Sequence, residues 1–370
     1  MRILITGGAG FIGSHLADAL LARGHAVRAL DNLDPQVHPA GRPAYLAPDV
    51  ELQVGDVRDH DAVARALDGV DALVHFAAAV GVGQSMYEIE RYTSINAIGA
   101  AVVLEEVARR RDRIGKMLVA SSMSIYGEGR YRCPRHGLLA PQVRSDEQLD
   151  RRDWELRCEE CGSVLEPLPT DEAKPIQPMS VYAVGKRDHE ELFLAIGRAH
   201  RLPTVALRFF NVYGERQALS NPYTGVAAIF GGRLLNDNAP LVFEDGQQSR
   251  DFVHVSDIAR GCLAALEGSG ADYRAVNLGT GRPTSVLDVA RELARGLGKD
   301  IDPRVVNKFR AGDVRHCYAD ITLARRLLAF EPQVDFGAGM RELLGWVATQ
   351  QATDTVDTAA RQLEEAGLTR

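Results

Sequence analysis

Tyr182 and Lys186 lie four residues apart in the sequence SVYAVGK. On a helix, side chains at this spacing project from one face, so both groups would reach the same site. A tyrosine with an ordinary pKa of about 10 is a poor base at neutral pH, but a nearby ammonium favours the phenolate. The pair is therefore a candidate activated general base, although the same spacing is also common on solvated helix faces.

A second group of hydroxyls ends an apolar segment. Residues 116–127 read KMLVASSMSIYG, and Ser122 and Ser124 lie where the apolar run stops. In an open parallel sheet, ligands bind outside the carboxyl ends of the strands. The sequence therefore predicts a binding site at this end of the segment.

The first thirteen residues predict the element that would hold a cofactor. They read MRILITGGAGFIG, a short apolar strand followed by glycines and an apolar-periodic helix. The glycines let the backbone turn tightly and approach a pyrophosphate, and the helix offers its free N–H groups to the phosphates. A second apolar stretch ends in Asp31, roughly 20 residues after the last glycine, where a carboxylate accepts hydrogen bonds from an adenosine ribose and repels a 2′-phosphate. This pattern predicts a dinucleotide site that prefers NAD to NADP.

Two further strands fit the same sheet. Residues 54–57, VGDV, place Asp56 within reach of an adenine, and residues 72–78, ALVHFAA, end in small residues that let a cofactor lie against backbone. Apolar strands alternate with helical patterns through about residue 210, which predicts an α/β fold with a doubly wound parallel sheet.

Together with the segment RFFNVYG at 208–214, these motifs resemble the extended short-chain dehydrogenases/reductases, and more narrowly the NAD-dependent nucleotide-sugar epimerases and dehydratases. The similarity covers about residues 1–350 apart from one insertion. It implies an NAD-binding Rossmann domain at 1–210 and a smaller α/β nucleotide-sugar-binding domain at 211–350 that is interleaved with it. Residues 351–370 are polar with a short helical pattern and are expected to pack loosely or fray. The cofactor contacts that it implies are Gly7, Gly10, Phe11, Ile12, Gly13, Asp31, Asn32, Asp56, Val57, Ala77, Ala78, Asn96, Tyr182 and Lys186.

The resemblance also implies a reaction. Tyr182 would take the proton from a sugar hydroxyl while hydride passes to tightly bound NAD, and Ser122 would hydrogen-bond the same oxygen. Lys186 would hold the nicotinamide ribose and lower the pKa of the tyrosine. The product of this step is a 4-keto sugar.

The fate of the 4-keto sugar depends on the residue two positions after the active-site hydroxyl. The 4,6-dehydratases that the chain resembles carry a carboxylate there, whereas this chain has Ser124. Ser124 either helps Ser122 to orient the sugar or caps the strand end. The expected outcome is rotation of the ketone and 4-epimerisation; a 4,6-dehydratase, a 4-ketoreductase and, more distantly, a non-catalytic NAD sensor are the alternatives.

Two arginine-bearing segments, QSRDFVHV at 248–255 and RAGDVRH at 310–316, resemble those that bind a nucleotide diphosphate. The resemblance implies phosphate contacts from Arg250 and Arg310, a ribose contact from Asp313, and an Asn211 contact near the diphosphate or sugar. Arg315 stays open. The substrate would be a UDP- or dTDP-hexose, with a lean towards a dTDP-6-deoxyhexose such as dTDP-L-rhamnose.

The insertion, residues 128–165, contains two short-spaced ligand pairs. They lie in CPRH at 133–136 and CEECG at 158–162, and such pairs suit tetrahedral zinc. A closed structural site would fold this polar loop; free thiols in a mobile loop are the alternative. The predicted zinc ligands are Cys133, His136, Cys158 and Cys161.

Composition limits the class of protein. The chain has 370 residues, 45% of them hydrophobic, and a net charge of −7, which argues against generic nucleic-acid binding. The five cysteines and the apolar first strand favour the cytoplasm over a secreted disulfide framework. By resemblance, the protein is expected to be a homodimer that pairs through the helices carrying Tyr182 and following Asn96.

Overall fold

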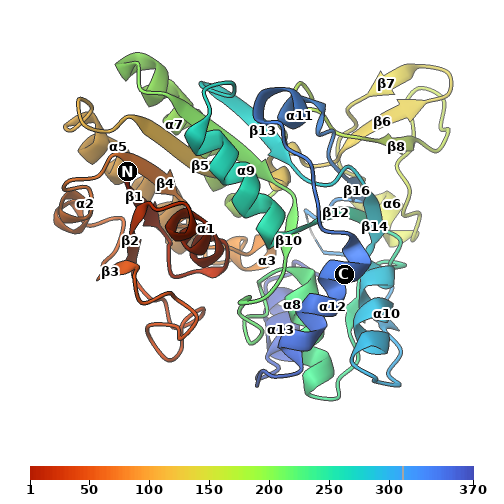
Figure 1. The fold of residues 1–370 in the computed structure, drawn as a ribbon. Coiled ribbons are helices and arrows are strands. Elements are labelled where there is room, and N and C mark those ends of the chain that lie inside the picture. Colours follow the sequence, from red (N-terminus) through yellow and green to blue (C-terminus); the bar gives the residue numbers. More distant parts are fainter. Residues whose placement is uncertain (311) are drawn as a thin grey trace.

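A seven-stranded parallel sheet forms the centre of the computed structural model, which describes residues 1–310 and 312–370 (Figure 1). Its strand order is β13-β9-β5-β4-β1-β2-β3, so the order reverses between β1 and β4. This arrangement confirms the predicted doubly wound sheet. The strands are β1 (Arg2–Thr6), β2 (Ala26–Asp31), β3 (Glu51–Val54), β4 (Ala72–His75), β5 (Lys116–Ser122), β9 (Thr204–Phe209) and β13 (Arg274–Leu278).

Helices cover both faces of the sheet because its strands are apolar on both sides. In β1, Ile3 and Ile5 pack into the core on one face and Leu4 into the core on the other. The helices of the first face are α1 (Phe11–Ala22), α9 (Val255–Glu267) and α11 (Thr322–Leu328). Those of the second face are α2 (His60–Ala66), α5 (Gly99–Ala108) and α7 (Val181–His200).

The chain returns to this sheet after it has left it. Helix α9 packs beside α1, and β13 pairs with β9 at the edge of the sheet. The first lobe therefore contains residues 255–278 and helix α11 as well as most of residues 1–210.

The second lobe is built on a smaller sheet with its own apolar core. Its strands are β10 (Asn211–Tyr213), β12 (Ser249–His254), β14 (Pro283–Ser285) and β16 (His316–Cys317), with β11 (Leu241–Val242) and β15 (Arg304–Val305) forming a separate pair. Its helices are α8 (Val226–Leu235), α10 (Val286–Gly296), α12 (Phe336–Val347) and α13 (Val356–Glu365).

The last twenty residues differ from the expectation of a loosely packed tail. Helix α13 buries Ala359 and Leu363, and the backbone of Arg370 exchanges hydrogen bonds of 2.9 and 3.1 Å with that of Phe309. The cause is an apolar stripe at helical spacing within an otherwise polar segment, which gives the helix a face to bury.

The insertion forms a small separate layer that projects from the second lobe, in yellow at the upper right of Figure 1. It has its own core, which includes Tyr131, Leu156 and Leu165. Its elements are β6 (Arg130–Cys133), β7 (Gly137–Leu139), α6 (Asp146–Asp150) and β8 (Glu166–Leu168). The remaining short elements are α3 (Val82–Ser85), α4 (Ile89–Thr93), the π-helix η1 (Ser94–Ile98) and the 3₁₀-helix η2 (Met123–Tyr126).

Among the helices of the described residues, none is long and apolar enough to span a bilayer.

Candidate active site

A cavity of about 630 Å³ runs from the carboxyl ends of the central strands to the second lobe. It lies where the strand order reverses, which is the usual ligand site of such sheets. Every cofactor and substrate residue predicted from the sequence lines this cavity except Asn96. The fold therefore brings the two predicted binding sites into one continuous space.

The glycine turn lies at the first end of the cavity. Gly7 has φ +70°, and a Cβ there would lie 2.8 Å from the backbone N of Ala77. Helix α1 begins after Gly10, and no side chain caps its amino terminus. The first N–H groups of the helix are therefore free to bind an anion. Phe11, Ile12 and Gly13 form this first turn and also line the cavity.

Two carboxylates lie at the ends of the next strands. Asp31 is fixed by hydrogen bonds from the backbone N of Ala9 (3.0 Å) and of Leu33 (2.9 Å). A hydrogen bond from Arg58 lowers the pKa of Asp56, so this group stays ionised at neutral pH. Asn32 and Val57 complete this part of the wall. The residues fit the adenosine half of NAD.

Asn96 has a different place from the one expected. It is fully buried behind the wall, where its Oδ1 accepts from the N–H of Ala79 (2.8 Å) and its Nδ2 donates to the carbonyl of Ala79 (3.1 Å). Ala77 and Ala78, which precede this clamp, line the cavity. In this structure Asn96 holds the backbone of Ala79 behind the wall, and its contact with the cofactor stays a prediction from the sequence.

The three predicted catalytic residues meet in the middle of the cavity. Ser180 caps α7 by accepting from the N–H of Ala183 (3.1 Å), which fixes Tyr182 and Lys186 on the first two turns. The Nζ of Lys186 donates to the carbonyl of Ala120 (3.1 Å) at the end of β5, close to Ser122. The helix cap and this bond hold the phenol and the ammonium at the strand end.

Desolvation controls the protonation of this pair. Burial raises the pKa of Tyr182 to about 12, and a hydrogen bond with Ser122 acts in the opposite direction. Burial lowers the pKa of Lys186 to about 7. Burial is the larger of the two effects on the Tyr182 phenol, and the lowering of its pKa by Lys186 stays an expectation from the resemblance.

Ser124 is joined to Ser122. Its hydroxyl donates to the Oγ of Ser122 (2.9 Å), and its backbone N–H donates to the same atom (3.2 Å). These contacts favour the orienting role for Ser124. The described lining residues in 120–124 and 179–186 include no carboxylate.

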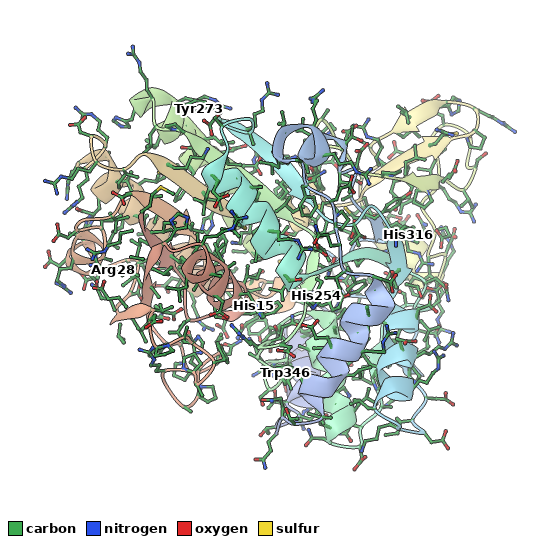
Figure 2. The ribbon with its side chains drawn as sticks, in the orientation of Figure 1. His15, Arg28, His254, Tyr273, His316 and Trp346 are labelled. Atoms are coloured by element: carbon green, nitrogen blue, oxygen red, sulfur yellow. The ribbon has the colours of Figure 1, made fainter. Side chains whose placement is uncertain are left out.

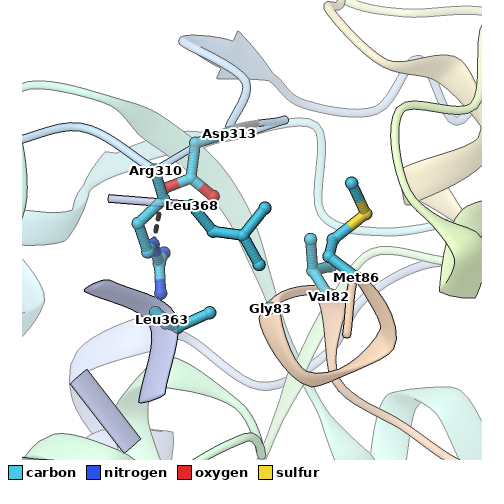
Figure 3. Close-up of a pocket in the computed structure, with 7 residues that line it drawn as sticks. All are labelled: Val82, Gly83, Met86, Arg310, Asp313, Leu363 and Leu368. Carbon is cyan, nitrogen blue, oxygen red and sulfur yellow. Dashed lines mark hydrogen bonds and ion pairs between the residues drawn. The ribbon is translucent and has the colours of Figure 1, made fainter. Parts of the chain in front are cut away.

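The predicted substrate residues lie at the far end of the cavity. The Oδ1 of Asn211 is buried and has no hydrogen-bond partner within the part of the chain that the structure describes. Arg310 pairs with Asp313 (2.8 Å) and stacks over Phe243, with 4.5 Å to the ring centroid. Figure 3 shows this pair beside Leu363 and Leu368, across a narrow recess from Gly83 and Met86.

The two other arginines have distinct surroundings. Arg250 lines the cavity and donates to the carbonyls of Val314 (2.6 Å) and Arg315 (3.1 Å). Arg315 itself is turned away and is buried among carboxylates of the second lobe and the insertion. The sequence left open whether Arg315 contacts the substrate. In the structure its side chain makes buried ion pairs within the protein instead.

Part of the wall was not predicted from the sequence. Helix α13 contributes Val356, Ala359, Ala360 and Leu363 to the cavity. Their spacing of three and four residues is a helical apolar stripe, which is the signal that predicts a packed helix. That signal does not indicate what the helix packs against.

The four predicted metal ligands come together outside the cavity. The ligand atoms of Cys133, His136, Cys158 and Cys161 all lie within 4.8 Å of one another. The Sγ atoms of Cys133 and Cys161 are 3.6 Å apart, and the Nδ1 of His136 is 3.1 Å from the Sγ of Cys158. Tetrahedral zinc with Zn–S bonds of about 2.3 Å needs sulfurs roughly 3.8 Å apart, so the donor set and its dimensions fit this ion.

Comparison with known proteins places the chain in a family. The model of the NAD dependent epimerase/dehydratase family matches residues 3–143 and 158–279. A dTDP-L-rhamnose 4-epimerase from Burkholderia thailandensis is 34% identical over 352 residues, which is 94% of this chain and 95% of the relative.

Solved structures agree with this match. The UDP-glucose 4-epimerase of Thermotoga maritima, with UDP-glucose, is 30% identical, has a TM-score of 0.77 and covers 94% of this chain and 99% of that chain. The UDP-glucose 4-epimerase of Thermus thermophilus, in complex with NAD, is 28% identical, has a TM-score of 0.74 and covers the same shares. The resemblance drawn from the motifs is confirmed, and the chain belongs to the NAD dependent epimerase/dehydratase family.

Proposed function

We propose that the protein is an NAD-dependent nucleotide-sugar 4-epimerase that works through a transient 4-keto sugar. The observation that carries the proposal is the position of Ser122, Tyr182 and Lys186. They lie in one cavity between a dinucleotide cradle and the arginines of the second lobe. The relatives named above are 4-epimerases, which supports the same reaction class.

The residues of the chain have separate tasks in this reaction. Tyr182 takes the proton of the 4-hydroxyl, and Ser122, oriented by Ser124, hydrogen-bonds the same oxygen. Bound NAD supplies a hydride acceptor and, in its oxidised form, a positive charge that favours the phenolate. Lys186 holds the cofactor ribose from the second turn of α7. Because burial raises the pKa of the phenol, the positive charge of the bound acceptor favours formation of the base.

The return step decides the product. After the ketone turns within the cavity, hydride returns to C4 from the opposite face and Tyr182 gives its proton back to the oxygen. A 4,6-dehydratase would need a base for the C5 proton, and the described wall beside Ser122 carries no carboxylate. A ketoreductase would have to exchange its cofactor at each turnover.

The second lobe supports a nucleotide diphosphate as the carrier of the sugar. Arg250 and Arg310 supply cations for the diphosphate, Asp313 supplies a carboxylate for the ribose, and Asn211 has a free carbonyl oxygen. We take a UDP- or dTDP-hexose as the substrate class. A dTDP-6-deoxyhexose such as dTDP-L-rhamnose is the first candidate, because the 34% identical relative is named a dTDP-L-rhamnose 4-epimerase.

Proton NMR in heavy water tests the reaction directly. The protein is mixed with a panel of UDP- and dTDP-sugars, and inversion at C4 is expected with no deuterium entering the sugar, since hydride returns to the carbon that it left. Deuterium at C5, with loss of the 6-hydroxyl, would show dehydration and overturn the proposal. The sugar that reacts fastest identifies the substrate.

A homodimer is proposed from exposed apolar side chains on neighbouring helices. Ile89 and Ile98 are 55% and 54% exposed, and Val184 and Leu192 on α7 are 45% and 36% exposed. Helices α4, η1 and α5 all pack against α7, so the elements that carry these exposed apolar side chains lie together. A second copy of the chain is the proposed occupant.

Light scattering after size exclusion tests the dimer. Leu192→Glu places a charge in the proposed interface, so this variant should elute as a monomer at concentrations where the unmodified protein is a dimer. Leu138→Glu, at a 60% exposed position in the insertion, is the matched control and should remain dimeric. A monomeric unmodified protein would contradict the proposal.

We also propose that the cluster of Cys133, His136, Cys158 and Cys161 holds one structural Zn²⁺. All four positions are filled by protein, so the site is closed and its contribution is to the folding of the insertion. The cytoplasmic location stays a prediction from the sequence.

A further inference from the structure

The insertion reaches into the second lobe with a buried charged side chain. Arg144 is 2% exposed and forms a bidentate ion pair with Glu244, which is also 2% exposed, at 2.7 and 2.9 Å. The Nη2 of Arg144 lies 3.4 Å from the backbone carbonyl of Asp313. The insertion is therefore in direct contact with the segment that carries Arg310 and Asp313.

Two carboxylates of the insertion region hold the next residues of that segment. Glu128 accepts from the backbone N–H of Arg315 (2.7 Å), and Glu155 accepts from the Nε of Arg315 (3.0 Å) and contacts the Nε2 of His316 (3.2 Å). The side chain of Arg315 is 1% exposed. Figure 2 shows His316 at this junction, below the strands of the insertion.

The same segment fixes a second phosphate-binding candidate. The carbonyls of Val314 and Arg315 accept from the guanidinium of Arg250, which lines the cavity. A shift of this backbone would move Arg250 as well as Arg310 and Asp313. One short segment thus sets the position of three of the groups proposed to bind the nucleotide diphosphate.

Arg144 and Glu155 lie in a stretch that the family model does not match. The family model matches residues 3–143 and resumes at 158, so both residues fall between the matched stretches. Metal-ligand candidates flank them on both sides, His136 before Arg144 and Cys158 after Glu155. Both charges therefore lie in the part of the insertion between the two pairs of metal-ligand candidates.

We propose that Arg144 and Glu155 are positioning residues that hold segment 312–316 in the geometry that binds the substrate diphosphate. This proposal rests on the proposed function, because it assumes that Arg250, Arg310 and Asp313 bind a nucleotide. The buried ion pairs are geometrically specific contacts, and their replacement loosens the segment without touching the catalytic residues. Binding to the nucleotide is lost equally from ground state and transition state, so KM rises and kcat does not fall.

The experiment compares nucleotide affinity with cofactor content. Arg144→Met removes the contact to Asp313, and Arg144→Met combined with Glu244→Gln removes the charges of both partners of the ion pair. Arg315, which also contacts Glu244, keeps its ion pairs with Glu155 and Asp245 in the double variant. Glu155→Gln is an independent variant that keeps the shape of the side chain. Arg157→Met is the matched control, since the ion pair of Arg157 with Asp153 is on the surface of the insertion.

Calorimetric titration with dTDP and with UDP gives the affinity, and NAD released on denaturation gives cofactor content. The Kd of the bound nucleotide should rise about tenfold or more in the Arg144 and Glu155 variants, with a matching rise in KM, kcat within about twofold and unchanged NAD. The Arg157→Met protein should match the unmodified one. If Arg144→Met does not fold, the double variant and Glu155→Gln carry the test.

The outcomes separate the two proposals. Folded variants that bind dTDP and UDP as tightly as the unmodified protein, or that lose kcat instead of KM, would overturn the positioning role alone. An unmodified protein that binds neither nucleotide would overturn the proposed function and this inference with it.

Discussion

Turnover of the Tyr182→Phe variant should fall about a thousand-fold while NAD stays bound, because one positioned general acid–base group contributes roughly 10² to 10⁴. The substitution removes only the phenolic oxygen and keeps the ring that lines the cavity. The glycine turn and Asp31, which are proposed to hold the cofactor, are untouched. Initial rates with the substrate found by NMR, together with NAD content per chain, check the prediction.

Tyr273→Phe is the control for this substitution. It removes the same atom from a tyrosine next to β13 that does not line the cavity, at the top of Figure 2. This variant should keep full activity. A Tyr182→Phe protein with near-normal turnover would mean that another group accepts the proton.

The pH profile gives an independent check on the same residue. Burial raises the pKa of Tyr182, so kcat/KM of the unmodified enzyme should rise with pH as the phenol loses its proton more readily. The residual activity of Tyr182→Phe should lack this rise. An unchanged profile in the variant would assign the titration to another group.

The unmodified protein should contain about one zinc per chain, and Cys158→Ser should contain almost none. Binding of structural zinc contributes about 10 kcal/mol or more to the folding of small domains, and the insertion has only a small core of its own. Its backbone should become sensitive to proteases when the metal is lost. Elemental analysis and limited proteolysis of residues 128–168 measure both effects.

Cys262→Ala is the matched control for the metal experiment, because Cys262 is a buried cysteine of α9 outside the cluster. This variant should keep its zinc. A folded, active and metal-free unmodified protein would contradict the zinc proposal and leave the four side chains as free thiols.

The parts predicted from the sequence are those that local physics determines. Each of these features depends on residues that lie close together in the chain. They are the strand and glycine turn before Phe11, the carboxylate at Asp31, and the helical spacing of Tyr182 and Lys186. The family and the fold class that follow from them agree with the comparisons and the structure. The spacing of the cysteine pairs likewise predicted which side chains come together.

Contacts between distant segments could not be predicted in this way. Asn96 has the chemistry of a cofactor contact, yet its orientation depends on Ala79 and α7, which pack around it. The burial of Arg315 depends on Glu155, 160 residues earlier in the chain. The pKa of Tyr182 depends on how completely the fold removes water, and composition and spacing carry no information about that.

The return of the chain to the central sheet has a consequence for how substrates enter. Hinge motion between two lobes needs a few connections that bend together, but here the backbone crosses between the lobes before β10, before α9, after β13 and on either side of α11. Opening as two rigid halves would strain all these crossings at once. We therefore expect loops and side chains at the rim of the cavity to move when the sugar nucleotide enters. The 4-keto sugar then rotates inside walls of fixed shape, which keep bulk water away from this reactive intermediate.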